Sequence, residues 1–120
     1  MTKKDNNLFP CPSCGFLVYS EPPGSYEICI ICNWENDHVQ LTYPGMRGGA
    51  NKGSLKEYQD SILKEIPANI KKYKGKKRDP KWRPLRDDEV IDSPKGTGRE
   101  YFHAAAKDSP DYYWQSKRND

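Results

Sequence analysis

The chain has 120 residues, which is enough for one small domain, and Leu, Ile, Val and Phe supply only 19 of them. That share of about 16% lies below the roughly 20% at which a chain begins to look disordered, so a hydrophobic core alone is excluded as the source of stability. The net charge of +3 is small, and 3 Trp, 8 Tyr and 3 Phe side chains are available for burial, so complete disorder is not expected either.

Nothing in the sequence predicts a membrane partner or export. No apolar run approaches the roughly 20 residues that span a bilayer. The first residues lead into no hydrophobic stretch typical of a signal peptide. We therefore expect a cytoplasmic protein, in which residues 1–8 form a disordered N-terminus.

Four cysteines offer the missing source of stability. They fall into two Cys-x-x-Cys pairs separated by 14 residues: Cys11, Cys14, Cys29 and Cys32. A two-residue gap lets one tight turn direct two sulfur atoms to a common point, and two such turns complete a tetrahedron of thiolates. Gly15 and Asn33 follow the two pairs, and both residue types tolerate the positive φ that such turns often need. The spacing predicts a structural zinc site. We call the turn that holds Cys11 and Cys14 the first knuckle and the turn that holds Cys29 and Cys32 the second knuckle.

Two disulfides, a redox-active pair and an iron site are the alternatives to zinc. Disulfides are disfavoured in a reducing compartment, and neither pair follows a buried strand and opens a helix as in thioredoxin-like proteins. Iron stays a minor alternative, because it also accepts four thiolates. Since four protein ligands leave no coordination position open for water, we expect the metal to stabilise the fold and not to catalyse a reaction. His38 is interpreted as a surface or loop residue.

A strand hairpin is expected between the two knuckles. Residues 16–19 and 25–28 are strand-like, and residues 21–24 have turn composition. Because a hairpin alone is marginal in water, we expect Trp34 and residues 39–41 to cover its apolar face.

A glycine-rich loop over residues 43–53 precedes the clearest helix signal. Ser54 and Glu57 match a capping box, and Leu55, Tyr58, Ile62 and Ile66 form one apolar stripe at helical spacing. Pro67 ends this helix, and residues 68–73 are interpreted as a further helical turn. The predicted fold class is α+β, with a small zinc-ribbon or knuckle hairpin packed against one or two helices.

Residues 71–83 are strongly basic. They hold eight basic residues and one acidic residue, with Tyr73 and Trp82 between them. Basic side chains neutralise phosphates and aromatic rings stack on bases, so this segment is a candidate nucleic-acid site. A solvated helix end and a basic protein-binding surface are the alternatives. The candidate residues are Lys71, Lys72, Lys74, Lys76, Lys77, Arg78, Lys81, Trp82 and Arg83.

Residues 90–120 are expected to form an irregular or short-helical C-terminal extension, with a short helix over 99–107. Three consecutive aromatic residues lie near its end, Tyr112, Tyr113 and Trp114. They fold back to bury themselves, present an anchor to a partner, or remain loose.

Several short motifs together resemble the cysteine-rich CPCC family of small bacterial proteins. They lie at residues 9–16, 20–29, 32–35, 39–41 and 48–55, and residues 82–85 with Glu89 resemble the segment that closes that domain. The similarity therefore implies a zinc-stapled domain over 9–89. Ser13 departs from the family pattern, because the motif for which the family is named has Cys at this position. Four cysteines nevertheless remain to bind a metal.

The resemblance implies a function in binding. Some members similar to this chain look like immunity proteins, which neutralise a cognate toxin by occluding its active site. The sequence agrees with a protein that is not an enzyme, since no nucleophile with a paired base, phosphate loop or small-molecule site is evident. A protein toxin is the expected partner, and a nucleic-acid-binding zinc ribbon is the alternative.

Exposed aromatic and charged residues beside a rigid element make good anchors for a partner. On this ground the candidate contacts are Trp34, Glu35, Asp37, Tyr43, Arg47, Tyr112, Tyr113 and Trp114.

Overall fold

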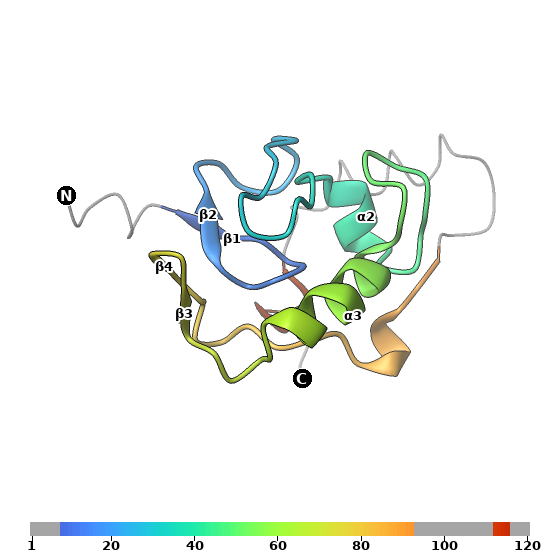
Figure 1. Cartoon of the computed structure of the whole chain (residues 1–120). Helices are drawn as coiled ribbons and strands as arrows, with labels where there is room; N and C mark the ends of the chain where they lie inside the picture. Colours follow the sequence, from blue (N-terminus) through green and yellow to red (C-terminus); the bar gives the residue numbers. More distant parts are fainter. Residues whose placement is uncertain (1–7, 93–111, 116–120) are drawn as a thin grey trace.

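The computed structural model describes residues 8–92 and 112–115, and the predictions for residues 1–7 and 99–107 lie outside this part of the chain. Within the described residues, two small antiparallel hairpins and two helices surround one core, which confirms the α+β class (Figure 1). The elements in chain order are β1 (Phe9–Pro10), β2 (Leu17–Tyr19), α2 (His38–Thr42), α3 (Leu55–Glu65), β3 (Lys72–Tyr73), β4 (Lys76–Lys77), and the 3-10 turns η1 (Asp87–Glu89) and η2 (Tyr113–Gln115).

The predicted hairpin between the knuckles is wrong in its pairing. β2 pairs with β1, which precedes the first knuckle, and not with residues 25–28. Residues 25–28 form only one isolated bridge, between Ile28 and Glu35 across the second knuckle. Each knuckle thus closes its own short hairpin, because a local turn costs less chain entropy than a connection over the longer loop.

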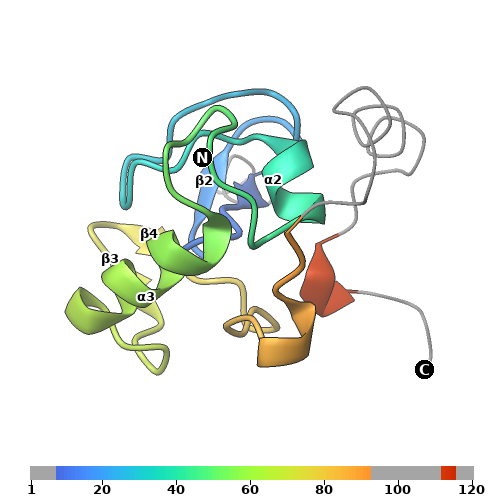
Figure 2. The ribbon, with the colours of Figure 1, turned by 90° about the vertical axis from the view of Figure 1, so that its right-hand side faces the viewer.

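Helix α3 begins and ends where the sequence predicted. The Ser54 side chain accepts a hydrogen bond from the Glu57 amide, and the Glu57 side chain accepts one from the Ser54 amide. Leu55, Ile62 and Ile66 are buried on one side of the helix. Figures 1 and 2 show α3 from two directions, beside the knuckles. Its buried apolar residues belong to the same core as the cysteines.

Helix α2 is a short helix that the sequence analysis did not predict. Asp37 caps it by accepting hydrogen bonds from the amides of Val39 and Gln40. Val39 and Leu41 are buried, as expected for residues that cover the knuckle hairpins. The stabilisation comes from the cap and from packing, since a helix of this length is not stable alone.

The further helical turn predicted at residues 68–73 is also wrong. The chain instead forms the hairpin β3–β4, with Lys72 opposite Lys77 and Tyr73 opposite Lys76. Lys74 and Gly75 connect the strands with φ values of 49° and 80°. Two positive φ values in a two-residue loop are typical of a type I′ turn, which favours glycine at its second position.

The core contains three of the cysteines together with large aromatic side chains. Phe16, Tyr19 and Trp34 are almost completely buried, and Trp34 packs edge-on against Tyr58 with a ring separation of 5.0 Å. Tyr112 also belongs to this core. Part of the predicted C-terminal extension therefore packs on the domain.

The aromatic residues at 112–114 fold back onto the domain, as the first of the sequence interpretations predicted. The Tyr113 hydroxyl accepts a hydrogen bond from Gln59 at 2.7 Å and donates one to the Arg83 carbonyl. Trp114 donates from Nε1 to the Asp79 carboxylate at 3.1 Å.

Among the described residues, no helix is long and apolar enough to cross a membrane.

Candidate metal centre

The four cysteines meet at one point in the interior. All four sulfur atoms lie within 4.8 Å of one another. The Cys11 and Cys32 sulfurs are 3.6 Å apart, and those of Cys14 and Cys29 are 3.7 Å apart. Zinc–sulfur bonds of about 2.3 Å at tetrahedral angles require sulfur separations of about 3.8 Å. The donor set therefore fits a tetrahedral metal ion bound by thiolates, a geometry that zinc and iron share.

The two knuckles have the same backbone hydrogen bonds. In the first, the Cys11 amide donates to the Phe16 carbonyl at 2.9 Å, and the Gly15 amide donates to the Cys11 carbonyl at 2.6 Å. In the second, the Cys29 amide donates to the Trp34 carbonyl and the Asn33 amide to the Cys29 carbonyl, each at 2.9 Å. The residues after the cysteine pairs have φ values of 83° and 72°, as their types suggested.

Backbone amides also point at the sulfur of Cys29. The Ile31 and Cys32 amides lie 3.3 Å and 3.4 Å from it. Amide hydrogen bonds stabilise a thiolate and hold it in position. The second knuckle is therefore arranged for a charged sulfur before any metal is considered.

Burial and mutual contact shift the pKa values of Cys11, Cys14 and Cys29. Cys11, Cys14 and Cys29 are completely buried, whereas Cys32 is half-buried. Desolvation, followed by contacts with the other cysteines, raises the pKa of Cys11, and desolvation raises the pKa of Cys14. Hydrogen bonds from the other three cysteines lower the pKa of Cys29. A bound divalent cation would replace the shared protons and neutralise the buried charge.

Tyr19 joins the two knuckles. Its hydroxyl donates to the Trp34 carbonyl at 2.5 Å and lies 3.7 Å from the Cys11 sulfur. Burial, followed by the charges of nearby cysteines, raises the pKa of Tyr19, so its proton stays in place. Hydrogen bonds of this kind orient metal ligands and tune their charge.

Arg78 supports the first knuckle and is not a surface contact for nucleic acid. Its side chain is buried and donates to the Cys14 carbonyl at 2.7 Å. Its remaining nitrogens donate to three carbonyls at the end of α3 and just beyond it, those of Ile66, Pro67 and Ile70. The guanidinium also packs between the rings of Phe16 and Trp82. A run of basic residues in sequence gives no sign of which one is buried.

Trp82 is likewise an internal residue. Its Nε1 donates to the Pro12 carbonyl at 3.0 Å, and its ring lies directly over Gly15. Arg83 forms a bidentate ion pair with Glu89 at 2.8 Å. Of the candidate nucleic-acid contacts, the exposed ones are Lys71, Lys72, Lys74, Lys77 and Lys81, and Lys76 is half-buried.

The candidate partner contacts divide in the same way. Trp34, Asp37 and Tyr112 lie inside the molecule, so a partner cannot reach them on this surface. Glu35, Tyr43, Tyr113 and Trp114 are half-buried, and Arg47 is exposed and paired with Glu57. Sequence spacing alone could not separate these groups, because each side chain's burial depends on distant segments.

Two buried amide side chains that the sequence analysis missed hold the glycine-rich loop against the second knuckle. Gln40 donates to the carbonyls of Met46, Asn51 and Gly53. Asn51 bonds to both backbone groups of Glu35, accepting at 2.8 Å and donating at 3.0 Å. This network positions the second knuckle without contacting the sulfur atoms.

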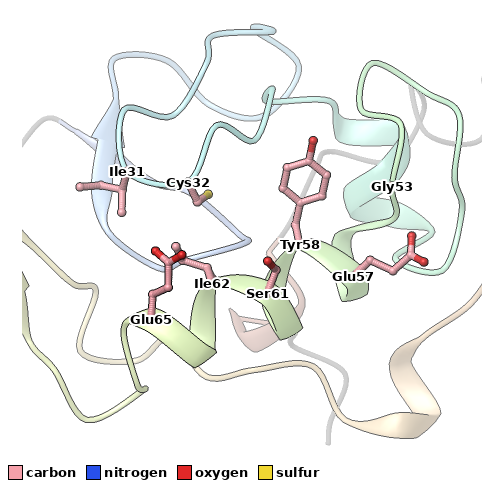
Figure 3. A pocket seen from close by; sticks show the side chains of 8 residues that line it. All are labelled: Ile31, Cys32, Gly53, Glu57, Tyr58, Ser61, Ile62 and Glu65. Atoms are coloured by element: carbon pink, nitrogen blue, oxygen red, sulfur yellow. The ribbon is translucent and has the colours of Figure 1, made fainter.

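A hollow of about 370 Å³ lies between the second knuckle and α3 (Figure 3). The half-buried Cys32 is on one wall, and Glu57 and Glu65 are on the other. The residues that line it are Ile31, Cys32, Gly53, Glu57, Tyr58, Ser61, Ile62 and Glu65. Of the four cysteines, only Cys32 lines this hollow, and it is the one that is half-buried and not completely buried.

Comparison with known families gives a match over most of the domain. The model of a family described as "Cysteine-rich CPCC" matches residues 9–83, which is more than half of the chain and includes all four cysteines. No curated protein matches the chain.

Proposed function

Because this chain belongs to the cysteine-rich CPCC family, we propose that it is a zinc-stapled binding protein, without catalytic activity, whose partner is another protein. The observation that carries the proposal is the closed set of four sulfur atoms at tetrahedral spacing. Four thiolate ligands leave no position for a reacting water, so the metal has a structural role. Zinc is favoured over iron because four cysteines in two spaced pairs are the usual ligands of a structural zinc ion.

The use of the buried polar residues supports the same proposal. Asp37, Gln40, Gln59 and Arg78 are all buried and hydrogen-bonded to the backbone of neighbouring segments. Groups that hold the fold together in this way are not free to serve as acids, bases or nucleophiles. The function then depends on the surface that the metal centre holds in place.

Metal analysis of the purified protein tests whether zinc is bound and whether it stabilises the fold. We expect one equivalent of zinc and a colourless protein that loses cooperative melting after prolonged chelation. A coloured, redox-active preparation would favour iron and electron transfer. Cooperative melting that survives complete metal removal would overturn the proposal.

Toxin immunity is the form of protein binding that we propose, on the family resemblance. The test is co-expression with the product of the adjacent gene in a bacterial host. We expect that product to stop growth and the wild-type chain to restore it, while the Cys14→Ser variant does not. A neighbouring product that is harmless, or a toxin that is not neutralised, would contradict immunity.

Nucleic-acid binding is the second candidate, and the hairpin β3–β4 favours it. Five exposed or half-buried lysines lie on or beside this hairpin, Lys71, Lys72, Lys74, Lys76 and Lys77. Binding through them should weaken steeply with salt. Retardation of RNA or DNA at low salt that is lost on changing Lys72 and Lys77 to Gln would support it. No retardation at low salt would remove it.

A further inference from the structure

The second knuckle carries an exposed apolar surface that the core does not use. Among the described residues, five large apolar or aromatic side chains are exposed, and three of them lie within residues 26–30. Tyr26 is 50% exposed, Ile28 59% and Ile30 67%. We call these three residues, together with Glu35, the knuckle edge.

Exposure of these side chains is unusual for this chain, because apolar residues are scarce in it. Leu, Ile, Val and Phe number only 19 of 120 residues, and the fold depends on a metal centre to supplement its core. Two isoleucines on one short segment are nevertheless left in solvent. Exposed apolar side chains grouped on one short segment are a candidate site of interaction.

The knuckle edge is also rigid. The Cys29 amide and the Glu27 carbonyl pair with Trp34 and Asn36 on the adjacent segment. Cys29 lies between the two exposed isoleucines and is one of the four clustered cysteines. The metal centre therefore anchors the knuckle edge, which projects from the body of the molecule at the left of Figure 2. An anchored surface loses little entropy when a partner binds.

Acidic groups border the knuckle edge, and basic groups do not occur nearby in the sequence. Ile28 and Glu35 are directly opposite each other in their bridge, so their side chains lie on the same face. The Tyr26 amide donates to the Asn36 carbonyl, so Tyr26 lies beside the backbone of Glu35 and Asp37. Burial, followed by the charges of Asp37 and Glu35, raises the pKa of Tyr26. Residues 5–46 contain no lysine or arginine.

We propose that the knuckle edge is a docking site for a protein segment that carries apolar side chains beside lysine or arginine. The apolar side chains would cover Ile28 and Ile30, and the basic groups would pair with Glu35 and with Glu65 at the neighbouring hollow. A symmetric contact between two copies is disfavoured, because it would bring two acidic edges together. The inference rests on the proposed protein-binding function and names its surface.

The test uses a displayed library of random linear peptides, selected against the zinc-loaded full-length chain. The test variant changes both Ile28 and Ile30 to Lys, and the matched control is Ile91→Lys, an isoleucine with 51% exposure elsewhere on the surface. We expect the selected peptides to combine apolar and basic residues. They should bind the double variant at least about ten-fold more weakly than the wild type, and the control equally well.

A second variant guards against loss of folding. Glu35→Gln keeps the backbone hydrogen bonds to Asn51 and removes only the charge. It should weaken the selected peptides a few-fold and reduce the salt dependence of binding. Peptides that bind all variants within about two-fold, or that lack basic residues, would overturn the proposal. A selection that enriches no peptide, or a wild-type dimer that the double variant dissociates, would overturn it too.

Failure of this surface can be told apart from failure of the proposed function. If the toxin of the co-expression test binds the wild type and the double variant equally, the protein-binding function stands, but the knuckle edge is not its docking site. If that toxin does not bind at all, immunity is wrong, and the peptide selection alone decides whether the knuckle edge binds basic segments.

Discussion

The two knuckles have one backbone design and opposite surroundings. In the first, Pro12, Ser13 and Cys14 are completely buried beneath Trp82, Gln59 and Arg78. In the second, Ile28 and Ile30 are exposed and Cys32 is half-buried. The same metal-binding turn can therefore serve as an internal anchor or as a rigid surface, depending on which segments pack over it.

Removing a metal ligand should have the largest effect, and the same effect in both knuckles. We expect Cys14→Ser and Cys32→Ser each to abolish cooperative unfolding and metal retention, because metal binding here is largely folding free energy. Circular dichroism melts and metal analysis measure this. A Cys32→Ser variant that keeps its metal and its melting transition would show that the exposed knuckle is dispensable.

Replacing Arg78 should test the anchoring of the first knuckle. Arg78→Met leaves four carbonyl acceptors without their donor, and we expect it to lower the free energy of unfolding by about 4 kcal/mol. Lys77→Met on the neighbouring exposed position is the matched control, with an expected change below about 0.5 kcal/mol. Denaturant titration compares the two, and equal effects would contradict the structural role of Arg78.

The residues after the two cysteine pairs provide a direct contrast. Gly15→Ala should cost about 3 kcal/mol, because a Cβ there meets positive φ and lies 2.5 Å from the Trp82 ring. Asn33→Ala, with positive φ but an exposed site, should cost about 1 kcal/mol, and Asn33→Gly should be nearly neutral. Similar losses for Gly15→Ala and Asn33→Ala would mean that Trp82 does not press on the first knuckle.

Ser13 should give the smallest effect. Its hydroxyl is buried and has no hydrogen-bond partner among the described residues. Ser13→Ala removes an unsatisfied polar group, so we expect the stability to rise by up to about 1 kcal/mol. A clear loss of stability in the same denaturant titration would show that the hydroxyl has a partner after all.

Features that depend on neighbours in the chain could be predicted from the sequence. The capping box that starts α3 needs only Ser54 and Glu57, and the sulfur cluster needs only two spaced pairs of cysteines. Both are satisfied by hydrogen bonds or turns within a few residues. The family resemblance rests on the same local motifs.

Features that the local sequence leaves ambiguous, or that depend on distant segments, could not be predicted. The β1–β2 pairing and the hairpin at residues 72–77 are local, but their sequences are compatible with more than one local structure, whereas the burial of Arg78 depends on distant segments. A lysine-rich segment is compatible with a helix end or a hairpin, and the outcome depended on whether Lys74 and Gly75 adopt positive φ. No local signal tells which of eight basic residues turns inward.

The sequence by itself determined the ligands, the turns around them and the main helix, because short-range geometry specifies each of these. Only the tertiary structure decided which knuckle is covered and which is exposed, since Arg78, Trp82 and Gln59 reach the first knuckle from later segments. Burial is a property of the whole packed chain. For that reason the candidate binding surface, unlike the metal ligands, became visible only in three dimensions.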